Sequence, residues 1–371
     1  GMKKTEIAIV GGGPAGLGAA LSAATMGAQV VLFDRQHNLG GQLVKQTHKF
    51  FGSKAQFAGE RGIKIAENLA AKVIAHPNIK VLLNSTVLGY YNDKELMFQQ
   101  GRHDLDIIKA DQIVVAAGAS EKMLAFPNND LPGIVGAGAI QTLMHIDGVL
   151  PGSNVLVVGS GNIGLIVTYQ LMQAGVNVVA IVEAAPRIGG YLVHASKIRR
   201  LGVPILTRHS IKTAIGTDRV EKAVIWQLDS QWQGIEGTEQ TLAIDTIALA
   251  VGLSPCAELL WQANCAIADV PELGGFVAYH NDRYETTSPG ILVAGDAAGI
   301  EEASAALLEG ELAGIFAAQN IGHNFEGAEA IIAKKRAELA SLRNGPTGEK
   351  IRAGMARLEE RGDHQCLNKL G

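Results

Sequence analysis

Cysteine is scarce in this sequence, and closely paired cysteines are absent. The 371 residues include three cysteines, Cys256, Cys265 and Cys366, and no two of them form a Cys-x-x-Cys pair. They exclude a disulfide framework, a dithiol redox motif and a cysteine-ligated iron–sulfur cluster within the chain, and they indicate a reducing cytoplasm. Ten histidines are scattered without the spacing of metal ligands, so we expect no metal site.

A surplus of one charge and long apolar runs are missing as well. The formal net charge of −4 gives no basis for binding nucleic acid or an anionic membrane surface. No segment reaches the roughly 18 consecutive apolar residues that a membrane span needs. Glu6 and the glycines at 11–13 interrupt the apolar run near the N-terminus, which argues against a signal peptide. We therefore expect a cytoplasmic globular protein, and its length predicts two domains.

Glycine is abundant instead, and it marks a motif in the stretch IAIVGGGPAGLGAALSAATMGAQVVLFDR, residues 7–35. The apolar run at 6–10 predicts a buried parallel strand. The segments 17–26 and 29–33 predict a helix and a second strand, with Gly27 as the stop between them. This is the order of a dinucleotide-binding βαβ unit.

The glycines of this stretch have the G-x-G-x-x-G spacing, with Gly11, Gly13 and Gly16 in the three positions. The first glycine permits a tight turn, the second lets the backbone approach a pyrophosphate, and the third allows close helix–strand packing. Pro14 stands at the helix start, where a missing N–H costs little. Asp34 follows the second strand, where a carboxylate binds ribose hydroxyls.

The same device occurs a second time, in VLVVGSGNIGLIVTYQLMQAGVNVVAIVEA, residues 155–184. Gly159, Gly161 and Gly164 repeat the glycine spacing, and Glu183 repeats the acid. One such turn is weak evidence, but strand, turn, helix, strand and acid in register twice predict two dinucleotide-binding modules. The alternative is that the glycine turns bind no ligand, and this alternative has more weight for the second copy than for the first. A nicotinamide and a flavin are a natural pair, because the first passes a hydride that the second accepts.

A third motif resembles the second flavin-binding segment of the pyridine nucleotide–disulfide oxidoreductase family. It lies in TTSPGILVAGDAAG, residues 286–299, where Pro289, Gly290, Ile291, Gly295 and Asp296 follow in the order of the family pattern, which looks like T-x-x-P-G-[IV]-x-A-x-G-D. The resemblance implies that Asp296 accepts a hydrogen bond from the ribityl chain of FAD. It also places the start of the next helix, near Ala303, beside the pyrimidine end of the flavin ring, where the helix dipole would favour negative charge.

The resemblance covers roughly residues 5–325 and assigns further residues to two cofactors. Those assigned to FAD, by the motifs at LGGQL, STVLGY and VVAAGAS among others, are Gly11, Gly13, Pro14, Ala15, Gly16, Asp34, Arg35, Gly41, Gln42, Leu43, Thr47, Val87, Ala117, Gly118, Gly295, Asp296, Ala303 and Ser304. Those assigned to NAD(H) are Gly159, Gly161, Asn162, Ile163, Gly164, Glu183 and Gly252. Because Glu183 would repel a 2′-phosphate, NAD(H) is expected in preference to NADP(H).

The resemblance also implies the fold. We expect an α/β protein with two Rossmann-like domains of the three-layer ββα type. The NAD-binding domain, residues 121–253, is inserted into a discontinuous FAD-binding domain, residues 1–120 and 254–325. The charged segment 326–371 is expected to be a helical appendage, with helices over 328–343 and 349–361. A cut near Asn324 should then leave both cofactor modules intact.

Closer resemblance points to one branch of the family. The segments GGQL…THKFFG and AGDAAGIEEASAALLEGELAG look like the alpha subunits of opine oxidase, hydrogen cyanide synthase and sarcosine oxidase. They also look like flavoproteins associated with anaerobic glycerol-3-phosphate dehydrogenases. Such subunits work beside a second flavoprotein, which implies a redox partner protein here. The alternative is a small acceptor such as a quinone or oxygen, and a homo-oligomer stays open.

Two functions follow from these observations. In the first, the protein is an enzyme that moves a hydride between NAD(H) and FAD and exchanges electrons with an external acceptor; without a cysteine pair it is not a disulfide reductase. In the second, it is an electron-transfer or scaffold subunit whose second module holds an adenine nucleotide without turnover. His48 and Lys49 are candidate catalytic residues near the flavin. The alternative, which we favour, is that both belong to a solvated loop without a catalytic role.

Overall fold

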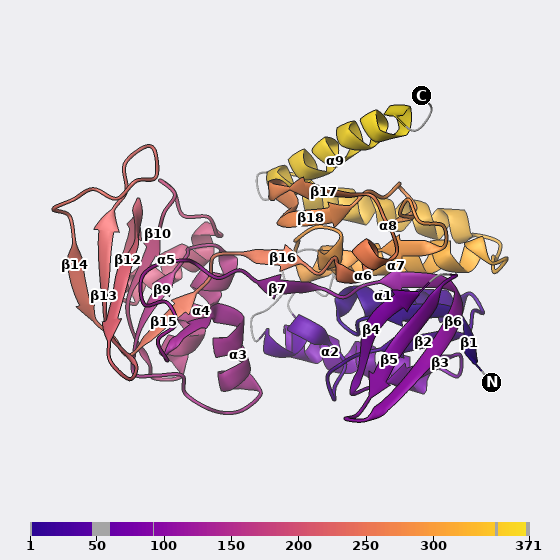
Figure 1. The fold of residues 1–371 in the computed structure, drawn as a ribbon, viewed down its shortest axis with the longest axis horizontal. Helices are drawn as coiled ribbons and strands as arrows, with labels where there is room; N and C mark the ends of the chain where they lie inside the picture. Colours follow the sequence, from indigo (N-terminus) through magenta and orange to yellow (C-terminus); the bar gives the residue numbers. More distant parts are fainter. Residues whose placement is uncertain (1, 47–59, 92, 346–347, 369–371) are drawn as a thin grey trace. The chain divides into compact units, whose positions relative to one another are not determined.

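The computed structural model describes residues 2–46, 60–91, 93–345 and 348–368. The chain forms two compact units (Figure 1). Unit 1 consists of residues 1–120 together with 253–371, and unit 2 of residues 121–252. The strands β7 (Ala119–Glu121) and β16 (Leu253–Pro255) pair with each other where the chain leaves and re-enters unit 1.

Unit 1 is built on a sheet in the order β3-β2-β1-β6-β5-β4, with β19 also paired to β6. The parallel strands are β1 (Lys3–Val10), β2 (Val30–Phe33), β3 (Ile79–Leu82), the C-terminal part of β6 (Asp104–Val115) and β19 (Ile291–Val293). The strands β4 (Ser85–Tyr91) and β5 (Glu95–Gln100) form an antiparallel meander with the first half of β6. The parallel strands are short and apolar, as expected of strands buried on both faces.

Helices cover one face of the parallel strands in unit 1. They are α1 (Pro14–Thr25), α2 (Gly62–Ala75) and α7 (Ala303–Asn320). The other face packs on the meander and on the segment with α6 (Glu258–Gln262), β17 (Ile267–Val270) and β18 (Gly275–Ala278). Alternation along β1 separates the two cores, because Ile7 and Ile9 join the helix side while Ala8 and Val10 join the opposite side.

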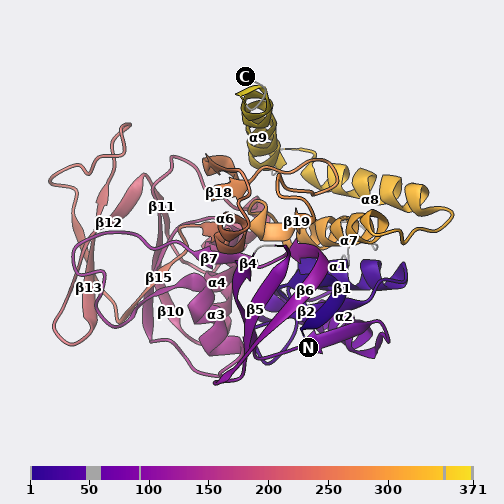
Figure 2. The ribbon, with the colours of Figure 1, turned by 45° about the vertical axis from the view of Figure 1, so that its right-hand side comes forward.

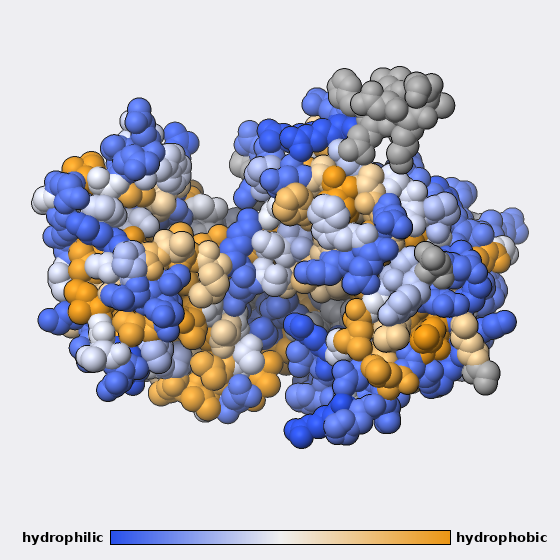
Figure 3. All heavy atoms as spheres, viewed as in Figure 1, coloured by the Kyte–Doolittle hydropathy of each residue, from blue (hydrophilic) through white to orange (hydrophobic). Residues whose placement is uncertain are grey.

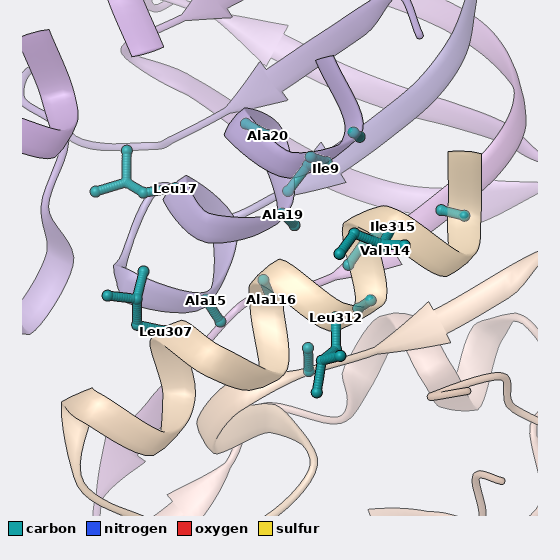
Figure 4. Close-up of a cluster of buried hydrophobic side chains, with 14 of the residues drawn as sticks. Ile9, Ala15, Leu17, Ala19, Ala20, Val114, Ala116, Leu307, Leu312 and Ile315 are labelled. Atoms are coloured by element: carbon teal, nitrogen blue, oxygen red, sulfur yellow. The ribbon is translucent and has the colours of Figure 1, made fainter. Parts of the chain in front are cut away.

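The helices α1 and α7 pack unusually closely, and small residues make this possible. A Cβ on Gly310 would lie 2.0 Å from the carbonyl oxygen of Ala15, and one on Gly314 would lie 2.3 Å from that of Ala19. Figure 4 shows Ala15 and Ala19 of α1 close to α7, beside Leu307 and Leu312. Nearly every residue of α7 is buried, as expected of a helix that is apolar all round. The pair holds the start of α1 in place.

Unit 2 has the same three layers as unit 1, namely helices, a parallel sheet and an antiparallel sheet, on a smaller scale. Its parallel sheet has the order β11-β10-β9-β15-β8, with β8 (Ile134–Gly136), β9 (Asn154–Val158), β10 (Asn177–Glu183), β11 (Ile205–Thr207) and β15 (Thr246–Leu249). The helices α3 (Ala137–His145), α4 (Asn162–Gln173) and α5 (Leu192–Arg200) belong to one face. The antiparallel sheet of β12 (His209–Gly216), β13 (Val220–Gln227) and β14 (Gln240–Ala243) belongs to the other. The expected α/β class with two Rossmann-like domains is confirmed.

The C-terminal segment forms the two expected helices, α8 (Ala328–Arg343) and α9 (Glu349–Asn368). The structure differs from the expectation of an appendage, however. Ile332 and Leu339 of α8 are buried in the same core as α1 and α7, and α7 and α8 lie side by side in Figures 1 and 2. Ile351 and Leu358 of α9 are buried against β17, β18 and the turn between them. Both helices are therefore part of the packing of unit 1.

The surface of unit 2 carries an apolar patch. In Figure 3 apolar residues gather over the region of α3 and the loop that follows it. Ile146, Val149 and Leu150 of that loop are about half exposed. Among the described residues, no helix combines the length and the apolar character needed to cross a membrane.

Candidate functional site

The first glycine turn joins β1 to α1, and two of its glycines are required by the packing of the chain itself. Gly11 has a φ of +107°, and a Cβ there would lie 2.1 Å from the carbonyl oxygen of Ala116. A Cβ on Gly16 would lie 1.6 Å from the carbonyl oxygen of Gly11. Any side chain at either position would force the turn, the neighbouring strand end and α1 apart.

Gly13, the middle glycine, is different. The nearest atom to a Cβ built there is the Cα of Gly41, at 3.8 Å, so the packing of the described chain does not require glycine. Gly13 is also the N-cap of α1, which has no side-chain cap, and Pro14 is the first helical residue. The N–H groups of the first turn of α1 therefore have no intrahelical partner and form an electropositive end. An open backbone beside a bare helix start is the geometry of a phosphate site.

Asp34 lies at the end of β2, beside this turn, and its carboxylate is buried. One oxygen accepts the N–H of Gly12 at 2.9 Å, and the other accepts the N–H of Gln36 at 2.8 Å. Burial raises the pKa of Asp34, while these two hydrogen bonds act in the opposite direction. Arg35, the next residue, is exposed.

The third motif meets the first in space, although about 280 residues separate them. Gly295 follows β19 with a φ of +75°, and a Cβ there would lie 2.6 Å from the Cβ of Ala15 at the start of α1. Asp296 accepts the backbone N–H of Glu301 at 3.2 Å. Burial raises the pKa of Asp296 to about 6. Ala303 and the buried Ser304 begin α7 a few residues later.

The loop after β2 also packs on the first turn. Gly40 donates its N–H to the carbonyl oxygen of Gly12 at 2.8 Å, and a Cβ on Gly41 would lie 2.8 Å from the Cα of Gly13. Gly41 begins the short 3₁₀ helix Gly41–Lys45, which also contains the exposed Gln42 and the buried Leu43. Thr47, His48 and Lys49 lie outside the described residues.

Two further predicted segments lie at the ends of strands next to the first glycine turn. The N–H of Ala116 donates to the carbonyl oxygen of Val10 at 2.9 Å, so Ala117 and Gly118 follow directly beside the first turn. Ser85, the first residue of β4, donates its N–H to the carbonyl oxygen of Asp34, and the half-buried Val87 stands two residues further along β4. Those predicted residues of unit 1 that the structure describes thus gather around the carboxyl ends of the parallel strands, where α/β proteins bind ligands.

The second glycine turn, between β9 and α4, has the same construction. Cβ atoms on Gly159 and Gly164 would each lie 2.1 Å from a backbone carbonyl oxygen. A Cβ on Gly161 would have no atom within 4 Å. Gly161 is the N-cap of α4, which again has no side-chain cap, and Asn162 and the part-exposed Ile163 follow. The middle glycine is again the one that packing does not explain.

Glu183 ends β10, and its carboxylate is held by three donors. Ser160 contributes its hydroxyl at 2.6 Å and its N–H at 3.1 Å to one oxygen, and Ala185 contributes its N–H at 3.0 Å to the other. The role of Ser160, which is fully buried, was not visible in the sequence, because Gly12 holds the equivalent position in the first module. Gly252, also predicted for this site, follows β15 with a φ of +108°.

The duplication extends to a Gly-Gly loop that sequence reasoning missed. Gly190 donates its N–H to the carbonyl oxygen of Ser160 at 2.9 Å, and a Cβ on Gly189 would lie 3.7 Å from the Cα of Gly161. In unit 1 the N–H contact comes from Gly40 and the close approach from Gly41, so the two glycines exchange these roles between the units. A signal was present: LGG at 39–41 and IGG at 188–190 each end seven residues after their acid.

The two described free cysteines form no disulfide. Cys265 is buried and donates to the hydroxyl of Thr286, and Cys256 is half-buried. Burial raises the pKa of both thiols. Within the described ranges no group of three or more histidine, cysteine, aspartate or glutamate side chains is placed to hold a metal ion.

Three curated relatives resemble most of this chain. The HcnB subunit of hydrogen cyanide synthase from Pseudomonas protegens is 27% identical over 83% of the chain, and the match spans 69% of that protein. The alpha subunit of sarcosine oxidase from Rhizobium meliloti is 27% identical over 82% of the chain and 29% of its own length. An opine oxidase subunit from Agrobacterium tumefaciens is 25% identical over 84% of the chain and 65% of its own length. These are the relatives that the sequence motifs indicated.

Solved structures resemble the fold. Thioredoxin reductase of T. acidophilum matches 86% of this chain and 99% of its own, with a TM-score of 0.70 and 19% identity. L-proline dehydrogenase from P. horikoshii matches 90% of this chain and 60% of its own, with a TM-score of 0.66 and 23% identity. The model of the pyridine nucleotide-disulphide oxidoreductase family matches residues 5–310, which include all three motifs. The chain therefore belongs to the pyridine nucleotide-disulphide oxidoreductase family and is a flavoprotein oxidoreductase.

Proposed function

We propose that unit 1 binds FAD, that unit 2 binds NAD(H), and that the protein transfers a hydride between them and exchanges electrons with an external acceptor or partner. The observation that carries this proposal is the pair of middle glycines. Gly13 and Gly161 stand at helix starts where the chain leaves room around the backbone. Their flanking glycines are explained by packing, whereas these two are explained by the approach of a pyrophosphate.

The residues of unit 1 fit FAD. The backbone at Gly11–Gly13 and the start of α1 would hold the pyrophosphate, and Asp34 would accept the hydroxyls of the adenosine ribose. Asp296, whose carboxylate receives one protein N–H, has acceptor capacity left for a ribityl hydroxyl. Bound FAD would supply a ring that takes up a hydride. The start of α7 at Ala303 and Ser304 would stabilise negative charge on that ring, and we assign the remaining predicted residues of unit 1 to the same cofactor.

The residues of unit 2 fit an adenine dinucleotide with a free 2′-hydroxyl. Glu183 would accept the ribose hydroxyls while Ser160 and Ala185 hold its carboxylate in place. A 2′-phosphate would meet a carboxylate at this position, and no arginine follows until Arg187. Loss of one hydrogen bond together with like-charge repulsion corresponds to about 2–4 kcal/mol, or roughly 30- to 1000-fold in affinity. We therefore propose NAD(H) in preference to NADP(H).

The electrons leave or enter through another molecule in this proposal. The two described cysteines form no disulfide, and burial raises the pKa of both thiols, so we propose no disulfide reductase activity. The three curated relatives are named as subunits of hydrogen cyanide synthase, sarcosine oxidase and opine oxidase, which supports a partner protein here. The exposed apolar loop at Ile146, Val149 and Leu150 is one surface that such a partner could cover.

A second function is favoured by the same relatives. Because they are subunits, this chain could serve as an electron-transfer or scaffold component of an amine, opine or polyol dehydrogenase, with an adenine nucleotide that does not turn over in unit 2. His48 and Lys49 remain candidate catalytic residues if the protein is an enzyme, although they lie outside the described residues.

Anaerobic titration separates the two functions. The protein, reconstituted with FAD, is titrated with NADH while the visible absorbance of the flavin is recorded. Bleaching with one NADH per flavin supports the hydride-transfer enzyme. Binding of NADH without bleaching supports the scaffold role. A folded protein that retains no FAD at micromolar concentration contradicts both.

A further inference from the structure

A buried carboxylate lies under the Gly295–Asp296 turn. Glu309, in the second turn of α7, is 1% exposed, and one of its oxygens accepts the N–H of Gly295 at 3.1 Å. Burial raises the pKa of Glu309 to about 7, even though the guanidinium of Arg343 acts in the opposite direction. A buried carboxylate is costly unless a cation and hydrogen bonds compensate it. Glu309 therefore needs Arg343 in order to hold Gly295 as a charged acceptor.

Arg343, the last residue of α8, is the cation that meets this need. Its Nη2 lies 2.9 Å from the second oxygen of Glu309. The same guanidinium binds both oxygens of Glu301, with Nη2 at 2.7 Å and Nε at 2.9 Å. Such a bidentate pair fixes orientation as well as distance. All three side chains are largely buried, so the pairing is protected from solvent screening.

Glu301 completes a second route to the turn. Its backbone N–H donates to the carboxylate of Asp296 at 3.2 Å, while its side chain is fixed by Arg343. One guanidinium from α8 is thus connected to Gly295 through Glu309 and to Asp296 through Glu301. The sequence places Arg343 far outside every cofactor motif, 47 residues beyond Asp296.

We propose that Arg343 is a positioning residue for the Gly295–Asp296 turn, so that retention of FAD in unit 1 depends on the C-terminal helix α8. The inference rests on the proposed FAD site. In the part of the chain that the structure describes, the Arg343 side chain bonds to Glu301 and Glu309 rather than to a residue assigned to FAD. It acts by pairing with the carboxyl group of Glu309 beneath Gly295 and by fixing Glu301, whose N–H orients Asp296.

The charges around the turn explain why we expect a neutral residue at position 343 to weaken it. Asp296, Glu301 and Glu309 contribute three carboxylates, and the guanidinium is the cation that two of them contact. Tyr284 interacts electrostatically with Glu301, Glu309 and Arg343, and its ring stacks on that of His280. Without Arg343 two carboxylates lose their partner, and either they take up protons or water enters beneath the turn.

The test compares Arg343→Gln and Arg343→Lys with a matched control on the same helix. Arg336 also belongs to α8 and packs a guanidinium on Phe316, but its polar contacts go to Asp282 and not to the turn. FAD dissociation constants are measured on full-length protein well below the melting temperature of each apoprotein. We expect Arg343→Gln to weaken FAD binding at least 10-fold. Arg343→Lys, which keeps the charge but loses the fork, should recover part of the loss, and Arg336→Gln should stay within about 3-fold of wild type.

The possible outcomes distinguish a failure of the positioning role from a failure of the proposed function. If folded Arg343→Gln binds FAD as tightly as Arg336→Gln does, or if Arg343→Lys is no better than Arg343→Gln, the positioning role is wrong. If Arg343→Gln does not fold, Glu301→Gln tests the route to Asp296. Weaker FAD binding by Glu301→Gln than by Arg336→Gln then supports the positioning role, and equal binding refutes it. If the wild-type protein binds no FAD, the proposed function fails and this inference fails with it.

Discussion

Replacing Gly13 with alanine separates a cofactor-binding role from a packing role at the first glycine turn. The φ of −79° and ψ of −166° at Gly13 suit any residue. A Cβ there has its nearest neighbour at 3.8 Å, which is ordinary van der Waals contact. The substitution therefore leaves the fold room for the added methyl group, which points into the space that the pyrophosphate would use.

The expected magnitudes differ for folding and for binding. At an N-cap, alanine costs up to about 1 kcal/mol relative to glycine, and the smaller entropy of the unfolded chain offsets roughly 0.4–1 kcal/mol of that. The apoprotein should then keep its stability to within about 1 kcal/mol. A methyl group that prevents close approach of the pyrophosphate should weaken FAD binding at least 10-fold, which corresponds to about 1.4 kcal/mol. Gly16→Ala, with a Cβ 1.6 Å from a carbonyl oxygen, should destabilise the apoprotein by about 1–3 kcal/mol or more.

The assay combines chemical denaturation of the apoproteins with calorimetric titration of FAD. Gly161→Ala provides the matched experiment in unit 2, where a Cβ has no atom within 4 Å, and there the affinity for NADH should fall while stability is kept. The reasoning is refuted if Gly13→Ala binds FAD as tightly as wild type. It is also refuted if Gly13→Ala destabilises the apoprotein as strongly as Gly16→Ala.

Three further predictions follow from the structure. Truncation after Asn324 removes at least four buried side chains of α8 and α9, worth about 6–12 kcal/mol in total, so circular dichroism and gel filtration should show an unfolded or aggregated unit 1 rather than an intact flavin domain. The Asp296→Asn substitution removes a carboxyl group whose pKa rises from 3.8 to about 6 on folding. Because the folded state holds that proton more tightly than the unfolded state, the free energy of unfolding of the wild-type apoprotein should fall by roughly 3 kcal/mol relative to the variant as the pH rises through this window. Equal melting shifts at pH 4 and pH 7 would contradict this expectation. Flavin reduction at limiting nucleotide should be at least 30-fold faster with NADH than with NADPH because of Glu183, and equal rates would reject its proposed role.

Much of the fold could be predicted because its signals are local. The order of strand, glycine turn, helix and acid depends on residues within about 30 positions of one another, and so do the bounds of α8 at Ala328–Arg343. The expected helix at 17–26 began three residues late, because the structure continues it back to Pro14, where Gly13 forms the N-cap. Turn chemistry and apolar periodicity are properties of short segments, so a single sequence carries them.

The sequence by itself determined that this chain has two dinucleotide modules, where each glycine turn lies and which acid accompanies it. Tertiary structure alone decided which distant residues meet at those turns. Gly295 lies against Ala15, Ser160 holds Glu183, and Arg343 reaches beneath the Gly295–Asp296 turn through Glu309. In the sequence α8 shows only a charged pattern typical of an exposed helix, and nothing in it distinguishes the arginine that becomes buried. The cost of an unpaired buried carboxylate makes that arginine necessary, and burial arises only when α7 and α8 pack together.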